Sequence, residues 1–207
     1  MQFTPEQKVL TDLFGDGILY NIPSYQRPYS WSARGKSDKD NQVNTMWQDL
    51  IDHFDNQRGD EIYFMGSMVL VGDPSDRVFE VVDGQQRLTT LALLFVAIRC
   101  MLEALDRNDM AEEEQNYVNS VAQEVERLLY NTKRRGATIK EKKVKISNTV
   151  GFDYDDMLGI AFECGSFPTD GLQDATEEQR QVSRRYFDNR RFFEEKLRER
   201  FLEEGKL

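Results

Sequence analysis

The sequence is poor in the side chains on which most metal sites and nucleophilic active sites depend. Its 207 residues include one histidine, His53, and two cysteines. Zinc sites, Ser-His-Asp triads and histidine-based nuclease sites need histidines placed with specific partners. His53 lies between Asp52 and Phe54 in a segment with helical spacing, so we interpret it as a surface side chain. The composition therefore excludes most histidine-based hydrolases, and no metal ligands are predicted.

The two cysteines, Cys100 and Cys164, have no partner at the spacing of metal ligands. Each lies in an apolar stretch with helical spacing, where a cysteine usually serves as a small core residue. The sequence has no apolar run near the roughly 20 residues that cross a bilayer. Residues 1–6 lack the basic and apolar regions of a signal peptide. We therefore expect a cytoplasmic protein without a membrane segment, in which the cysteines form no disulfide.

The net charge of −10 disfavours a nucleic-acid partner, because like charges repel. The basic residues are unevenly spread, however, and residues 127–145 contain eight of them beside one acidic residue. Two interpretations stay open: a solvated loop between helices, or a patch that contacts phosphates. In the second, the contacts to the DNA backbone would come from Arg134, Arg135, Lys142 and Lys143.

The pattern of apolar residues changes near residue 106. Before it, strand and helix patterns alternate, and after it the spacing is helical throughout. Turn residues between predicted strands at 62–71 and 78–82 indicate an antiparallel hairpin. We therefore expect an α+β fold, with a mixed sheet-and-helix domain at 1–105 and an all-helical extension at 106–207. A short strand is expected at 18–22, and helices at about 4–14, 45–54, 86–105, 110–130, 154–162 and 177–204.

The junction between the second hairpin strand and the long apolar helix has the chemistry of an anion site. The first N–H groups of a helix have no intrahelical acceptor and carry partial positive charge. Gly84 lacks the Cβ that would block a close approach to the backbone. Arg87 supplies a planar cation suited to phosphate oxygens, and Thr89 and Thr90 add hydroxyls. The segment therefore predicts a phosphate-binding site.

A purely structural interpretation of the same junction has equal weight on these grounds. Asp83 can cap the helix, while Arg87 makes a surface ion pair. Gln85 and Gln86 are harder to explain as caps, because their amides can read a base, hold a water or bridge to phosphate. The segment lacks the spacing of a P-loop, which excludes that family.

A second unusual segment is the loop at 22–31, which is dense in aromatic and proline residues. Its rings could stack on a base, and its arginine could meet a phosphate. The alternative is a loop whose rings fold back into the core, and the chemistry alone favours this. The residues concerned are Tyr25, Gln26, Arg27, Pro28, Tyr29 and Trp31.

Taken together, three segments resemble one family in both sequence and order. They are IPSYQRPYSW at 22–31, YFMGS at 63–67 and VDGQQRLTTL at 82–91. The sequence is similar in them to the N-terminal domain of GmrSD-type restriction endonucleases, also catalogued as domain of unknown function 262. The helical remainder fits the layout of that family but carries no diagnostic motif.

The resemblance implies a fold related to ParB and sulfiredoxin, followed by a helical extension. It also implies binding and hydrolysis of an NTP, most often GTP, with Mg²⁺. Asp83, Gln86 and Arg87 are the expected catalytic residues, and the nucleotide phosphates would be held by Gly84, Gln85, Gln86, Arg87, Thr89 and Thr90. The loop residues Tyr25, Gln26, Arg27, Pro28, Tyr29 and Trp31 would recognise a DNA modification or line the nucleotide pocket.

The partners that the resemblance implies are modified DNA and a nuclease domain or subunit of the HNH type, and a second copy of the chain is a further candidate. Nothing in these residues could form the HNH nuclease, so either the chain is part of a longer protein or the nuclease is a separate polypeptide. We expect an NTP-hydrolysing sensor of a restriction or anti-phage system. The alternatives are a non-catalytic module that binds modified DNA and recruits a nuclease, and a ParB-like endonuclease that uses Asp83.

Overall fold

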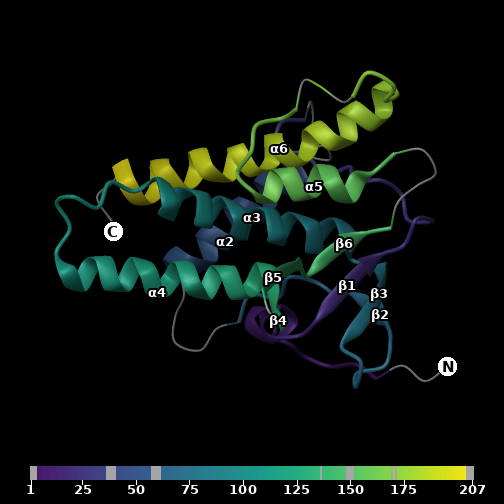
Figure 1. Ribbon diagram of the computed structural model, residues 1–207, viewed down its shortest axis with the longest axis horizontal. Helices are drawn as coiled ribbons and strands as arrows, with labels where there is room; N and C mark the ends of the chain where they lie inside the picture. Colours follow the sequence, from purple (N-terminus) through teal and green to yellow (C-terminus); the bar gives the residue numbers. More distant parts are fainter. Residues whose placement is uncertain are drawn as a thin grey trace.

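The computed structural model describes residues 4–35, 41–56, 62–135, 137–147, 152–168, 170 and 172–203. Helices and strands are mixed along the chain, which confirms the predicted α+β class. The sheet lies at one end of the molecule, and the long helices extend from it (Figure 1). Among the described residues, no helix is long and apolar enough to span a membrane.

The main sheet has the strand order β2-β3-β1-β6. The central strand β1 (Leu19–Ile22) is parallel to both β3 (Val78–Asp83) and β6 (Val144–Ile146). β2 (Val69–Val71) pairs antiparallel with β3, which confirms the predicted hairpin, although β2 is shorter than expected. Parallel strands aligned in this way bring their carboxyl ends to the same edge of the sheet.

The helix α3 (Gln85–Ala104) is the centre of the helical part, and its side chains are buried around most of its circumference. A helix of this kind belongs in a core rather than at a surface. It runs between α6 (Glu177–Leu197) and α4 (Glu112–Leu129), as Figure 1 shows. The remaining helical elements are α1 (Leu10–Leu13), α2 (Gln42–Asn56), α5 (Tyr154–Phe162) and the π-helical turn η2 (Arg198–Glu203).

The basic segment is the largest departure from the predicted elements. β4 (Tyr130–Arg135) and β5 (Ala137–Lys142) form an antiparallel hairpin, and β6 follows at once and joins the main sheet. Charged residues obscure the period-two pattern of this segment, so the sequence analysis found no strand in it. One hydrophobic core contains side chains from both 1–105 and 106–207, so the division at residue 105 stays a prediction.

The expectation that the cysteines form no disulfide is wrong. Cys100 on α3 and Cys164 just after α5 are joined by a disulfide, with their Cα atoms 6.0 Å apart. The packing of α5 along α3 brings the two residues to the separation that such a bond requires. The two cysteines are 64 residues apart in the sequence, so no local pattern indicated that they are close in space.

Candidate functional site

The three segments that carry the family resemblance meet around the first turn of α3. Because β1 and β3 are parallel neighbours, the loop after β1 and the start of α3 lie at the same edge of the sheet. Gln26 joins them directly, since its Nε2 donates to the carbonyl of Val82 at 2.7 Å. The sequence blocks thus form one structural unit.

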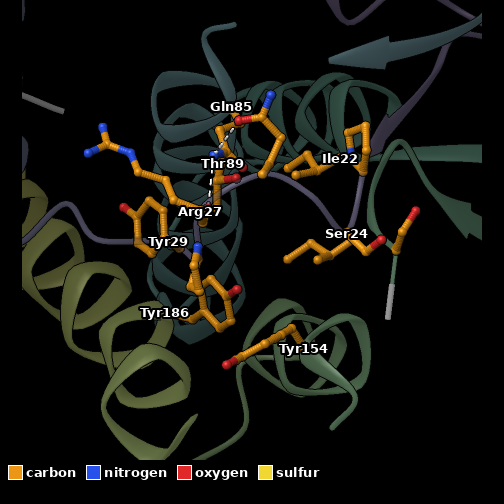
Figure 2. Close-up of a pocket in the computed structure, with 13 residues that line it drawn as sticks. Ile22, Ser24, Arg27, Tyr29, Gln85, Thr89, Tyr154 and Tyr186 are labelled. Atoms are coloured by element: carbon orange, nitrogen blue, oxygen red, sulfur yellow. Dashed lines mark hydrogen bonds between the residues drawn. The ribbon is translucent and has the colours of Figure 1, made fainter. Parts of the chain in front are cut away.

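Gln85 and Gln86 hold the aromatic loop in place. The Nε2 group of Gln85 donates to Oε1 of Gln26 at 3.0 Å and to the carbonyl of Arg27 at 2.9 Å, as Figure 2 shows. The Oε1 atom of Gln86 accepts from the backbone N–H groups of Ser30 at 2.8 Å and Trp31 at 3.2 Å.

Gln86 also donates from Nε2 to the carbonyl of Pro28 at 3.3 Å. The amide N–H groups of both glutamines are therefore used within the protein. This corrects the expectation that these amides face a base or a phosphate. Their partners lie more than fifty residues away in the sequence, so the sequence pattern gave no sign of them.

Arg87 secures the second of the three blocks. Its Nη1 donates to the carbonyl of Ser67 at 3.0 Å, and its guanidinium lies against Gly66. A Cβ at Gly66 would come within 2.8 Å of Nη2, and Gly66 has φ of 93°, a conformation that favours glycine. Arg87 is half-buried, and the Nη1 side of its guanidinium is hydrogen-bonded within the protein.

The hydroxyl of Thr90 faces the loop, although the sequence analysis expected it to bind phosphate. Its Oγ1 donates to the carbonyl of Gln86 at 2.8 Å and lies 2.7 Å from the hydroxyl of Tyr29. Asn189 on α6 donates to the same tyrosine hydroxyl at 2.9 Å. Thr90 is fully buried, so the expectation of a phosphate contact is wrong for this residue.

The aromatic loop divides into a buried and an exposed part. Tyr29 is buried and stacks on Tyr186 with ring centroids 5.4 Å apart, and burial raises the pKa of Tyr29 above its usual range. Trp31 packs against the core. Both rings therefore serve the core, as the alternative interpretation held. Tyr25 and Arg27, by contrast, are exposed.

A small pocket opens beside this loop at the carboxyl ends of β1 and β6. The loop after β1 forms one wall, and Gln85 and Thr89 from α3 form another (Figure 2). The remaining walls come from the segment after β6 and from Tyr154 and Tyr186. Open sheets bind ligands beyond the carboxyl ends of their strands. The favoured position is the point in the sheet where the connections after two neighbouring strands run to opposite sides. The chain leaves β1 toward β3 and later returns on the other side as β6.

The pocket has a volume of about 30 Å³, where one water molecule needs about 10–15 Å³. It can therefore receive a group of a few atoms but not a whole nucleotide. Of the described residues that line it, Arg27 is the one charged residue. The sequence pattern did not indicate Ser147, Tyr154 or Tyr186 as site residues. The two tyrosines lie in segments whose spacing is typical of core helices.

The start of α3 has no side-chain cap on its backbone donors. Gly84 adopts a left-handed conformation with φ of 93°, and no side chain caps the helix. Asp83 at the end of β3 is exposed. No group of three or more histidine, cysteine, aspartate or glutamate side chains in the described ranges is placed to hold a metal ion. Mg²⁺ often uses one or two protein carboxylates together with substrate phosphates, and Asp83 suits that arrangement.

Two of the predicted DNA contacts are corrected by the structure. The ammonium group of Lys143 is buried and donates to three backbone carbonyls, including that of Gly15 at 2.8 Å, and burial lowers its pKa. Lys142 is mostly covered and forms an ion pair with Asp155 at 3.1 Å. The ammonium groups of these two lysines therefore bind partners within the protein instead of DNA phosphates. Arg134 and Arg135 lie on β4, but their side chains are outside the described residues.

Comparison with models of protein families identifies a match over most of the chain. The family model described as the GmrSD restriction endonuclease, N-terminal domain, matches residues 10–206. This range includes the sheet, the pocket and nearly all of the helical part. No curated protein matches the chain.

Proposed function

The chain belongs to the GmrSD restriction endonuclease N-terminal domain family, and we propose that it is the NTP-binding and hydrolysing sensor of its system. Membership of this family makes it part of a restriction system. The proposal goes further and assigns the nucleotide to the edge of the sheet where the three sequence blocks meet. A nuclease domain or subunit of the HNH type would then cut the DNA.

One observation carries this proposal: the uncapped start of α3 lies at the carboxyl ends of parallel strands, beside a pocket with an arginine on its rim. Helix N-termini attract phosphates through their free N–H groups and the helix dipole. Arg27 is exposed there and can add a charged contact. Gln85, Gln86 and Arg87 would act indirectly, by fixing the loops that frame the site.

The hydrolytic step is assigned to Asp83. Its carboxylate is exposed at the end of β3 and can orient a water or share Mg²⁺ with the nucleotide. Mg²⁺, when bound, would neutralise charge on the phosphates. The exposed part of the loop, which includes Tyr25 and Pro28, would read the DNA modification.

The first test is nucleotide binding by Arg27→Ala. Loss of a charge-assisted hydrogen bond of about 1.5–3 kcal/mol should weaken GTP binding roughly tenfold to a hundredfold. Arg198→Ala is a suitable control, because this exposed arginine lies at the far end of α6. Calorimetry with GTP and Mg²⁺ gives the affinities, and equal affinity in the two variants would contradict the site.

A second candidate is a binding module that hydrolyses nothing. The observation in its favour is that Gln85, Gln86 and Arg87 each donate side-chain hydrogen bonds to the protein itself. Phosphate release separates the two functions when it is measured with GTP and Mg²⁺, with and without modified DNA. The sensor predicts release that falls in Asp83→Asn while GTP still binds. No phosphate release by wild type, with or without modified DNA, while GTP or DNA still binds would favour the binding module.

A further inference from the structure

Three side chains in the pocket are buried yet lack hydrogen-bond partners. Thr89, Tyr154 and Tyr186 have exposed fractions of 2%, 6% and 1%. Among the described residues, no group donates to or accepts from their hydroxyls, although these hydroxyls do reach the pocket. These hydroxyls are not among the enclosed polar atoms that lack partners, so they remain accessible and can bind a ligand or water.

The three hydroxyls come from different elements and surround the same space. Thr89 lies on α3, Tyr154 begins α5 and Tyr186 is in the middle of α6. Figure 2 shows Gln85 and Thr89 on one side of the space and the two tyrosines on the other. Since Gln85 and Thr89 are one helical turn apart, they share a face of α3.

The chemistry of the pocket selects the kind of group that can enter. Its walls carry hydroxyl donors from Thr89, Tyr154 and Tyr186, with Ser24 and Ser147 at the edge, and the one charge is the cation of Arg27. Burial raises the pKa of both Tyr154 and Tyr186, so their hydroxyls stay protonated and able to donate. Many donors, one cation and no carboxylate among these residues suit a compact oxyanion.

We infer that the pocket binds a single phosphoryl group through the hydroxyls of Thr89, Tyr154 and Tyr186. The small volume accommodates such a group but excludes a base or a whole nucleotide. The phosphoryl group can come from an NTP, in which case the inference rests on the proposed function, or from a DNA backbone. In both cases α5 and α6 complete a site whose other residues come from the sequence blocks.

The test compares the double variant Tyr154→Phe/Tyr186→Phe with wild type, because these changes remove two hydroxyls and keep the rings. Tyr20→Phe is the matched control, since it removes a buried hydroxyl whose partner is the carbonyl of Leu13. Calorimetry is run separately with inorganic phosphate, GTP and a short DNA duplex. Loss of two neutral hydrogen bonds should weaken binding about tenfold, and the control should change it less than twofold.

Thr89 provides a second arm that does not alter a ring. Thr89→Val should weaken the same ligand, and Thr89→Ser should restore its binding because it keeps the hydroxyl. Unfolding curves show whether each variant is folded. The Thr89 variants therefore test the inference even if the tyrosine variants lose stability.

The outcomes distinguish this inference from the proposed function. GTP or phosphate binding that falls in the hydroxyl variants supports the inference. Binding of phosphate, GTP and DNA that is unchanged in them overturns it, and unchanged GTP binding leaves the nucleotide sensor intact. Binding of DNA but not GTP, lost in the same variants, supports the pocket and contradicts the sensor. A wild-type protein that binds none of the three probes overturns the inference.

Discussion

Two groups of buried polar side chains lie around the first turns of α3, and they differ in hydrogen bonding. In the first, Gln86 and Thr90 are bonded to the aromatic loop, to Tyr29 or to their own helix. In the second, the hydroxyls of Thr89 and Tyr186 face the pocket without a partner among the described residues. The first turns of α3 therefore carry both side chains whose hydrogen bonds are made within the protein and a hydroxyl that remains available to a ligand.

The comparison separates the residues that build the site from those able to bind a ligand. Side chains whose donors and acceptors are all used make a rigid and specific network. Side chains left unpaired in a buried place cost stability unless something else satisfies them. The most recognisable sequence motif is thus mainly structural, and the open donors come partly from segments without a motif.

The largest effect is expected from breaking the completed network at Gln86. Gln86→Leu would leave two backbone N–H groups and one carbonyl without their partner. Since an unsatisfied buried group costs about 1–3 kcal/mol, the free energy of unfolding should fall by about 3 kcal/mol. Urea denaturation measures the change.

The control for this variant is Gln123→Leu, at an exposed position on α4. It should alter the free energy of unfolding by less than about 0.5 kcal/mol. If the two leucine variants are equally stable, the network does not hold the loop as described.

A smaller effect is expected at Gly84, which joins β3 to α3. Gly84→Ala would force a non-glycine residue into φ of 93° and bring its Cβ within 2.6 Å of Cγ of Met68. The expected loss is about 1–3 kcal/mol in the free energy of unfolding. The double variant Gly84→Ala/Met68→Ala should lose less than the sum of the single changes, because the closest contact, with Cγ of Met68, is removed. Strict additivity in a thermal unfolding series would contradict the close approach.

The smallest effect on stability is expected from the hydroxyls that face the pocket, in contrast to the bonded side chains around Gln86. Thr89→Val and Tyr186→Phe remove hydroxyls that have no protein partner, so the free energy of unfolding should change by less than about 1 kcal/mol or rise. Chemical denaturation without ligand is the appropriate measurement. A loss as large as that of Gln86→Leu would mean that these hydroxyls belong to the completed network.

Much of the fold followed from the sequence because its signals are local. The range predicted for α5 was confirmed, and that for α3 to within one residue, since apolar spacing and turn residues mark them. The hairpin β4–β5 and the strand β6 were missed, because charged residues mask their alternation. Pairing of β6 with β1 depends on residues more than one hundred positions apart, which no local pattern records.

The sequence blocks indicated where the candidate site lies, but not which contacts their side chains make. Three sequence blocks indicated the junction at 83–87, and the structure brings all three together there. The roles of Gln85 and Gln86 were misread, because a side-chain amide has the same sequence signature whether it binds a ligand or a distant carbonyl. Tyr154 and Tyr186 resemble core aromatics, and only tertiary packing distinguishes them.

The late position of β6 has a consequence for how the protein is made. The ribosome delivers all three family blocks by residue 91, yet the strand that covers one edge of β1 follows at Val144–Ile146. During that interval β1 presents unpaired backbone groups of the kind that recruit other chains. A nascent or truncated product ending near residue 105 would therefore contain every diagnostic motif and still be prone to aggregate, so a soluble expression fragment has to extend past β6.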